Sequence, residues 1–390
     1  MDIYEDSLEK LLLFCERENW RGYDPYDGLN SRIFQIFPIK NKFTRLAFIQ
    51  FLKRVPFNLR KLFLIEKGLN PKGLGLFAEG YLKLYECFKL KEYRTKAIHF
   101  LNLLEQLSLK GYSGYCWGYN FDWQSRAFFV SQGTPNLVCT TFIANAFLEA
   151  YKILKNEKYL QVAQSSCEFM VNDLNITKED EAICFSYTPL DKTQIHNANL
   201  LAAALLARVY SLKREKNLLK FATEAVKFSL RYQNEDGSWY YGNLISQKWI
   251  DNFHTGFNLV ALKEYIDFSG SQGFYKALEK GFEYYKENFF LEDGISKYYH
   301  DKTYPIDIHS VAQSIITFVK LKDLDGGNTN QALKIAQWGI ENMQDERGFF
   351  YFQKHKYFTN KIPYIRWSQA WMAYALSTLI QVLKNERKKE

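Results

Sequence analysis

Two kinds of apolar pattern alternate along this sequence from about residue 70 onward. Stretches of the first kind are amphipathic with charged residues on one side, as expected for helices that face solvent. They cover residues 92–109, 158–174, 216–232, 274–290 and 330–343. Stretches of the second kind are rich in Ala, Leu, Thr, Ser and Gly and carry few charges, which predicts helices buried on all sides. The pattern therefore predicts an outer and an inner set of helices.

The inner stretches repeat at a regular step. Most of them end in an apolar run such as Val260-Ala261-Leu262-Lys263-Glu264-Tyr265. The matching positions are 66, 59, 55 and 55 residues apart, at Tyr85, Tyr151, Tyr210, Tyr265 and Lys320. Each step is the length of two helices with two connections. Six inner and about six outer helices are expected to close into an all-α (α/α)6 toroid, because an open array would expose one face of the apolar helices.

Composition supports one large core. The chain has 390 residues, of which 47% are apolar, and no segment is typical of a long linker or a separate domain. We therefore expect a single toroid domain over residues 1–390, with residues 1–65 as an N-terminal helical part of it. Aromatic turns after the outer helices, followed by short alternating segments, predict short β-hairpins at the rim.

The charge pattern indicates which partners the protein binds, and the cysteine usage indicates its cellular compartment. The net charge of +8 is distributed over Lys and Arg interleaved with acidic residues, which favours a solvated surface over a nucleic-acid groove. The six cysteines form no C-x-x-C pair, so buried free thiols are expected. The N-terminus lacks the features of a signal peptide, and no apolar run reaches about 18 residues. We expect a cytoplasmic protein without a membrane span.

Polar residues gather where the inner helices are expected to begin. The fourth inner helix begins with Asp251, Asn252 and His254, and the fifth with Asp307 and His309. Three of the six histidines fall at such positions. The other candidates at helix starts are Asn136, His196, Asn197, Tyr364, Arg366, Trp367 and Gln369. Asp and Asn there are also ordinary N-caps, and His can satisfy backbone groups. Their convergence on one mouth of the toroid predicts a site.

A rim segment ahead of the second inner helix adds stacking and charged groups. It contains Trp117, Asp122, Trp123, Gln124 and Arg126. Flat aromatic faces beside a carboxylate and a guanidinium suit sugars and acidic groups. Trp239, in the turn after the outer stretch 216–232, belongs to the same set of candidates. The high aromatic content, 17% of the chain, is in keeping with sugar binding, although wide turns between helices also need bulky filler.

The repeat resembles the six-hairpin glycosidase-type (α/α)6 superfamily. This superfamily includes glycoside hydrolases, unsaturated glucuronyl hydrolases, sugar epimerases and toroidal polysaccharide lyases. The resemblance covers nearly the whole chain and rests on the repeat, without a diagnostic motif. It implies a substrate pocket at one mouth of the barrel, where loops lead into the inner helices. No family's catalytic residues match these positions closely enough to be transferred.

Two other toroid classes are weighed against it. The segment Gln233-Asn234-Glu235-Asp236-Gly237-Ser238-Trp239 is similar to the Q-x-x-x-G-x-W repeat of squalene–hopene-type terpene cyclases. Those enzymes use an Asp-rich protonating motif, and the sequence has no D-x-D-D. Lanthionine cyclases need Cys and His zinc ligands, and only Cys139 stands near a helix start. We expect no metal and no cofactor.

Two chemistries remain open for a small-molecule or oligosaccharide substrate. The primary prediction is glycoside hydrolysis, which needs two carboxyl groups, here drawn from Asp251, Asp307 and Asp122. The alternative is a uronate lyase or C5-epimerase that uses His254, His309 and Tyr364 as base and acid. In that case Arg366, Asn197 and Asn252 neutralise the substrate carboxylate. A third reading is a non-catalytic glycan-binding toroid that serves polysaccharide biosynthesis.

Overall fold

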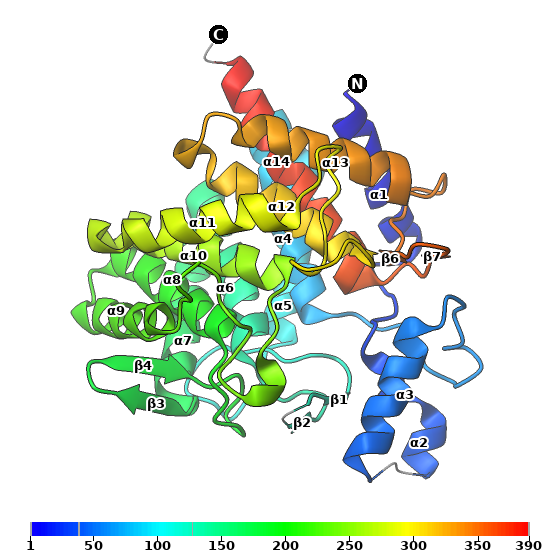
Figure 1. Cartoon of the computed structure of the whole chain (residues 1–390), viewed down its shortest axis with the longest axis horizontal. Coiled ribbons are helices and arrows are strands. Elements are labelled where there is room, and N and C mark those ends of the chain that lie inside the picture. The colour runs from blue at the N-terminus through cyan, green and yellow to red at the C-terminus, as the bar shows by residue number, and fades with distance from the viewer. Residues whose placement is uncertain (1, 38–39, 127, 389–390) are drawn as a thin grey trace.

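A computed structural model describes residues 2–37, 40–126 and 128–388 of the chain. Within these residues, six apolar helices form the inner ring: α4 (Pro71–Phe88), α6 (Leu137–Leu154), α8 (His196–Lys213), α10 (Asn252–Ser269), α12 (Ile308–Lys320) and α14 (Trp371–Arg387). Each contacts the next, and α14 contacts α4, so the ring is closed. The predicted all-α (α/α)6 toroid is confirmed (Figure 1).

Each of the outer helices packs mainly on the inner helix that precedes it in the chain. They are α5 (Lys91–Gln106), α7 (Glu157–Asp173), α9 (Lys216–Arg231), α11 (Tyr275–Phe289) and α13 (Asn328–Met343). The N-terminal helix α1 (Ile3–Arg17) takes the sixth outer place against α14 (Figure 1). Both ends of the chain therefore lie together, and the N-terminal residues complete the ring.

The inner helices begin and end by a common rule. Asn70, Asn136, Asp251 and Asp307 each cap an inner helix by accepting a hydrogen bond from a backbone N–H of the first turn. The helices α4, α6, α8 and α10 each span 18 residues and stop at a residue in the left-handed conformation. These four inner helices are thus equal in length and similar in how they end.

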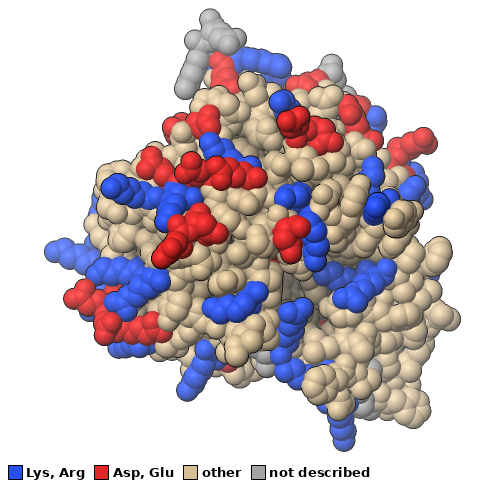
Figure 2. All heavy atoms as spheres, viewed as in Figure 1, with Lys and Arg blue, Asp and Glu red and all other residues tan. Residues whose placement is uncertain are grey.

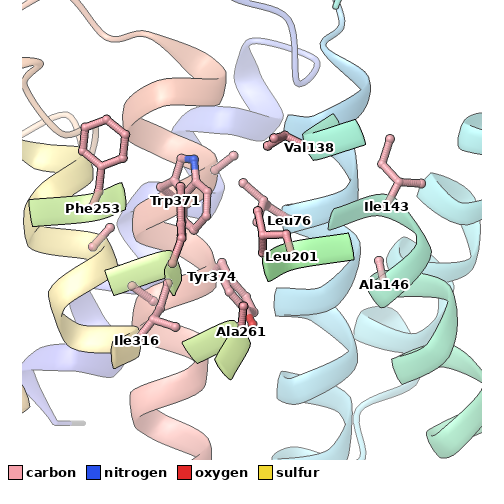
Figure 3. Close-up of a cluster of buried hydrophobic side chains, with 14 of the residues drawn as sticks. Leu76, Val138, Ile143, Ala146, Leu201, Phe253, Ala261, Ile316, Trp371 and Tyr374 are labelled. Carbon is pink, nitrogen blue, oxygen red and sulfur yellow. The ribbon is translucent and has the colours of Figure 1, made fainter. Parts of the chain in front are cut away.

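The barrel interior is apolar over most of its length. Leu76, Leu201 and Trp371 come from three different inner helices and converge between them (Figure 3). Small residues let the helices approach closely. A Cβ atom at Gly256 of α10 would meet two atoms of α12 at 2.7 and 2.8 Å. One helix, α6, is apolar and long enough to span a membrane among the described residues, but 72% of it is buried inside the structure.

Charged side chains fill the end of the barrel away from the helix starts. The guanidinium of Arg208 on α8 contacts the carboxylate of Glu149 on α6, and the Lys320 Nζ on α12 donates to Glu264 on α10 at 3.0 Å. Burial opposes ionisation of Glu149, but Arg208 and neighbouring lysines outweigh it and lower the pKa of this carboxyl. The second end of the barrel is thus occupied by ion pairs that link neighbouring inner helices.

Short strands lie between the helices, as predicted. They form the pairs β1 (Trp123–Gln124) with β2 (Phe129–Val130) and β3 (Ile176–Glu179) with β4 (Ala182–Phe185). A three-stranded antiparallel sheet joins β5 (Ile306–Asp307), β6 (Gln353–Lys354) and β7 (Thr359–Asn360).

Two further helices stand apart from the ring. The helices α2 (Arg32–Ile36) and α3 (Lys42–Arg54) project from the barrel at the lower right of Figure 1. They are anchored by α3, which contacts β1 and the 3-10 turn η1 (Asp27–Asn30). This excursion lies within residues 1–65 and reaches the rim that carries the predicted site.

Candidate functional site

A narrow recess opens where α8 and α10 begin. Its lining residues are Asn197, Trp239, Tyr240, Tyr241, Trp249, Asp251, His254, Thr255 and Asn258. The lining combines flat aromatic faces with a carboxylate, an imidazole and amides. The recess lies at helix starts where the sequence analysis expects a site. Asn197, His254, Thr255 and Asn258 come from the first two turns of α8 and α10, and Asp251 is the N-cap of α10.

Asp251 and His254 form a hydrogen-bonded dyad in this recess. Asp251 caps α10, and its side chain accepts from the His254 backbone N–H at 3.0 Å, from the His254 Nδ1 at 2.7 Å and from the Trp249 indole at 2.8 Å. Because a carboxylate only accepts, the Nδ1 of His254 must carry the proton. The Nε2 is then a free acceptor on a partly exposed ring. This arrangement fixes the tautomer and the orientation of the His254 ring.

His309 lies on the neighbouring inner helix without any polar partner for its ring. It is 2% exposed, and neither ring nitrogen has a hydrogen-bond partner among the described residues. The ring stacks on Trp371 at 4.5 Å and 30° and on Phe253 at 4.6 Å and 21°. Burial, followed by nearby Lys72, holds the pKa of His309 well below its usual value. The side chain is therefore a neutral imidazole that retains one donor and one acceptor.

The two imidazoles share a common aromatic wall. The ring of Phe253 lies 4.1 Å from His254 and 4.6 Å from His309. Phe257, one turn further along α10, lies 6.1 and 5.9 Å from the same two rings. Two histidines from adjacent helices thus flank one apolar surface, one of them oriented by a carboxylate and the other unpartnered.

Asp307 forms hydrogen bonds that link three elements beside the recess. It is fully buried and accepts from the His309 backbone N–H at 2.9 Å, from the Gln353 side chain at 2.6 Å and from the Trp367 indole at 2.9 Å. Burial raises the pKa of Asp307 to about 6, against these hydrogen bonds and the nearby Lys53. The carboxyl joins α12 to β6 and to the π-helical turn Ile365–Ala370, and so it fixes the backbone that carries His309.

Two lysines reach the mouth from outside the predicted set. The Nζ of Lys53 on α3 donates to the Tyr26 hydroxyl at 2.9 Å and lies 5.6 Å from the Trp367 ring. Lys72, in the first turn of α4, is buried with its Nζ over Phe142 at 4.2 Å and Trp371 at 5.0 Å. Burial, together with Arg366, holds the pKa of Lys72 well below its usual value. Lys72 was detectable as a charged residue at the start of an inner helix, whereas Lys53 carried no such signal.

Arg366 is engaged by a carboxylate from the N-terminal loop. Its Nε and Nη2 donate to the two Asp24 oxygens at 2.6 and 2.8 Å, and both side chains are buried. The guanidinium also lies 4.9 Å from the Tyr119 ring. The Arg366 guanidinium, which the sequence analysis expects to contact substrate, therefore already has a carboxylate partner within the chain.

Other predicted residues lie at or near the recess. Trp239 and Asn197 line it, and the Asn197 side-chain oxygen is buried without a partner among the described residues. The Arg126 guanidinium lies 5.2 Å from the ring of Trp249, which is itself part of the lining. Trp123 contacts the Tyr26 ring at 6.2 Å on the rim. These residues remain candidates for contact with a ligand.

Several predicted residues instead make structural hydrogen bonds. The His196 Nε2 is 3.1 Å from the Asn243 oxygen, and burial lowers the pKa of this histidine to about 4. The Asn252 amide bonds Ser296 between α10 and the loop after α11. Five of the remaining side chains form hydrogen bonds with backbone groups: Trp117 with Leu104, Asp122 with Gln132, Gln124 with Ser125 and Phe128, Asn136 with Cys139, and Gln369 with Phe350. The Tyr364 ring lies against the guanidinium of Arg60.

No group of three or more His, Cys, Asp or Glu side chains is placed to hold a metal ion in the described part of the chain. Asp251 with His254 supplies only two such groups, and Asp307 has its oxygens directed at an indole, an amide and a backbone N–H.

Comparison with known proteins places the fold. No protein-family model and no curated protein sequence matches the chain. Among solved structures it is similar to a cellobiose 2-epimerase from Bacillus thermoamylovorans B4167, with a TM-score of 0.65 and 11% identity over 81% of this chain and 88% of the other. An unsaturated glucuronyl hydrolase specific for heparin matches with a TM-score of 0.63 and 13% identity over 84% and 89%.

A family 76 glycoside hydrolase from a bovine Bacteroides thetaiotaomicron strain matches with a TM-score of 0.62 and 12% identity, over 82% of this chain and 69% of the other. The (α/α)6 toroid fold that the repeat predicts is thereby confirmed. At these identities the likeness defines the fold and leaves the reaction to be argued from the site.

Proposed function

We propose that this protein is a carbohydrate-active enzyme that moves a proton at a carbon atom of a sugar, as an epimerase or lyase does. The observation that carries the proposal is the pair of imidazoles that contact the ring of Phe253. His254 is oriented by Asp251 at 2.7 Å, and His309 has two unpartnered ring nitrogens. Solved structures of the same fold include a cellobiose 2-epimerase and a sugar epimerase, in agreement with this chemistry.

The roles follow from the geometry. The Nε2 of His254 accepts the proton from a carbon next to a carbonyl or carboxylate, since its Nδ1 is committed to Asp251. The resulting charge on the substrate oxygen is stabilised by the cationic side of the mouth, where Lys53 lies. His309 retains an N–H that can donate to the same substrate. The stacked pair Tyr241 and Trp249, with centroids 4.5 Å apart, forms the flat wall for a sugar ring.

Hydrolysis by paired carboxylates has less support from the same geometry. Asp251 is 2% exposed and Asp307 is fully buried. Each already accepts three hydrogen bonds from protein groups. A glycosidase needs one carboxyl group free to protonate the leaving oxygen and the other free to act on water or on the sugar. Neither carboxyl is free in this arrangement.

The test is proton exchange with solvent. The protein is incubated in D2O with a panel of reducing disaccharides and uronate oligosaccharides, and the recovered sugars are examined by NMR. We expect deuterium at one carbon, or an unsaturated product, with the wild type. His254→Gln should lower the rate by about 10²–10⁴-fold through loss of the base. Asp251→Asn should lower it by up to about 10⁴-fold, because the tautomer is no longer fixed.

The matched control is His300→Gln. The His300 Nδ1 bonds the Tyr284 hydroxyl at 2.8 Å outside the recess, so its loss should leave the rate unchanged. Cleavage of a glycosidic bond without deuterium in the product, insensitive to His254→Gln, would overturn the proposal in favour of hydrolysis. Unaltered sugar that nevertheless binds would favour a non-catalytic toroid.

A further inference from the structure

One segment has a net charge equal to that of the whole protein. Residues 32–67 contain nine Lys and Arg and one acidic residue, Glu66, which leaves +8. The whole chain has 51 basic and 43 acidic residues, which also leaves +8. The rest of the chain therefore carries 42 charges of each sign. The sequence analysis assigned the net charge of +8 to Lys and Arg residues along the whole chain. The count instead assigns this net charge to the segment that includes α2 and α3, because the rest of the chain is neutral overall.

The same segment exposes an unusual number of large apolar side chains. Among the described residues, eight of the 21 exposed large apolar side chains lie in it. They are Ile33, Ile36, Phe37, Phe43, Phe51, Phe57, Leu62 and Leu64. Phe37 is 73% exposed, Phe43 76% and Phe57 72%. We refer to residues 32–37 and 40–67 as the α2–α3 segment.

The helix α3 shows the pattern most clearly. Its buried face is formed by Ile49 and Leu52. The exposed positions Phe43, Ala47 and Phe51 follow at intervals of four, so they form a stripe along the opposite side. A surface helix normally carries polar residues on that side. Here the outward stripe is apolar.

Unpaired basic residues accompany this apolar surface. Lys40, Lys42, Arg54 and Lys61 are exposed, and none has an acidic partner among the described residues. In the space-filling view, the lobe that corresponds to α2 and α3 is mainly tan with blue side chains (Figure 2). Apolar and cationic groups are therefore presented together on a projecting part of the molecule.

We propose that the α2–α3 segment docks the protein on the surface of a bilayer that contains anionic lipids. Basic side chains are attracted to anionic headgroups, and exposed Phe, Leu and Ile side chains insert at the boundary with the acyl chains. An acidic protein would neutralise the lysines but would need pockets for Phe37, Phe43 and Phe57. A bilayer interface accepts both groups without matched shape, and so the lipid surface explains both features at once.

Docking would also set the position of the candidate site. Lys53 belongs to α3 and reaches the mouth at the Tyr26 hydroxyl. The helix contacts β1 and η1 at the rim. A segment bound at the bilayer surface would therefore hold the mouth of the toroid close to the headgroups. This inference is independent of the reaction proposed above.

The experiment is sedimentation with vesicles of phosphatidylcholine alone and of phosphatidylcholine mixed with phosphatidylserine. We expect binding of the full chain to the mixed vesicles, weakened by added salt. The variant Lys40→Gln, Lys42→Gln, Arg54→Gln and Lys61→Gln should lose at least about 10²-fold in partitioning, since each basic residue near the surface contributes about fivefold. Phe43→Ser with Phe57→Ser should lose at least about tenfold.

Matched controls remove equal charge and equal apolar area elsewhere. The charge control is Lys155→Gln, Lys213→Gln, Lys216→Gln and Lys220→Gln, all exposed at the ends of α6 and α8 or on α9, far from α3 in Figure 1. The apolar control is Leu190→Ser with Ile245→Ser, both highly exposed. Both controls should bind like the wild type.

Equal binding to the two vesicle types, or equal loss in segment and control variants, would overturn the proposal. So would absence of vesicle binding together with a dimer in sedimentation velocity that Phe43→Ser with Phe57→Ser dissociates. That result would assign the apolar stripe to self-association. Because the altered side chains are exposed, thermal unfolding of each variant should match the wild type, so that lost binding is separable from lost folding.

Discussion

The ion pair between Asp24 and Arg366 joins the two ends of the chain at the mouth of the barrel. Asp24 is 4% exposed and Arg366 3%. The bidentate hydrogen bonds of 2.6 and 2.8 Å are supplemented by the Tyr26 backbone N–H, which donates to Asp24 at 3.1 Å. Replacing Arg366 by Met removes the charge and keeps much of the volume. The Asp24 carboxylate would then be left buried with a single donor.

The expected decrease in the free energy of unfolding comes from leaving one buried charge without its partner. Removing one partner of a buried ion pair typically lowers the free energy of unfolding by about 3–5 kcal/mol. We expect this range for Arg366→Met and a similar loss for Asp24→Asn, which strands the guanidinium. The double variant should lose less than the sum of the two, by up to about 3 kcal/mol, because neither group is then left unpaired.

Urea unfolding followed by circular dichroism measures these differences through the shift in midpoint at constant slope. The control is Arg231→Met, since the Arg231–Asp180 pair is exposed and should contribute no measurable stability. A loss below about 1 kcal/mol for Arg366→Met, as for an exposed pair, would refute the reasoning. Strict additivity in the double variant would refute it equally, because it would deny the coupling.

Two further predictions concern stability. Burial raises the pKa of Asp307 from 3.8 to about 6, so the folded state binds a proton more tightly than the unfolded state. Relative to Asp307→Asn, the wild type should therefore gain up to about 3 kcal/mol as pH falls from about 6 to about 4, measured by urea unfolding at each pH; parallel profiles would contradict this. Gly256→Ala should lower the free energy of unfolding by about 1–3 kcal/mol through overpacking against α12, whereas Gly273→Ala, where a Cβ meets nothing within 4 Å, should not.

The helices were largely predictable because their signals are local. The step of 55 residues and the N-cap Asp251 place the start of α10 at Asn252, as the structure has it. Apolar inner stretches predicted burial, and closure of the ring followed from it. The amphipathic pattern also applies to α1, the sixth outer helix. Its pairing with α14, however, depends on contacts between the two ends of the chain.

The role of each polar residue at the mouth was less predictable, because one structural need recurs in every repeat. The aromatic turn after each outer helix has backbone groups that the first turn of the next inner helix must satisfy. The Gln369 amide does this for Phe350, and Asn199 does it for Phe185. Such residues look the same in sequence as ligand-binding amides. Only the three-dimensional partner separates them.

Lys53 was missed for a different physical reason. Its sequence neighbours predict a basic, apolar helix, and nothing local shows that this helix lies beside the toroid's mouth. The hydrogen bond to Tyr26 joins positions 27 residues apart, and proximity to Asp307 spans the whole ring. Contacts of that kind come from chain topology, which a periodic pattern does not encode.

The same distinction between paired and unpaired groups supports the proposed chemistry. Most polar side chains at the helix starts are satisfied by the protein, and a satisfied group has little to offer a substrate. His309 is the exception that costs most, because a buried donor or acceptor without a partner lowers stability by about 1–3 kcal/mol. Burial among Phe253 and Trp371 could have been achieved by an apolar residue at no such cost. An imidazole kept there, next to a histidine already oriented by Asp251, is explained by a ligand that completes its hydrogen bonds.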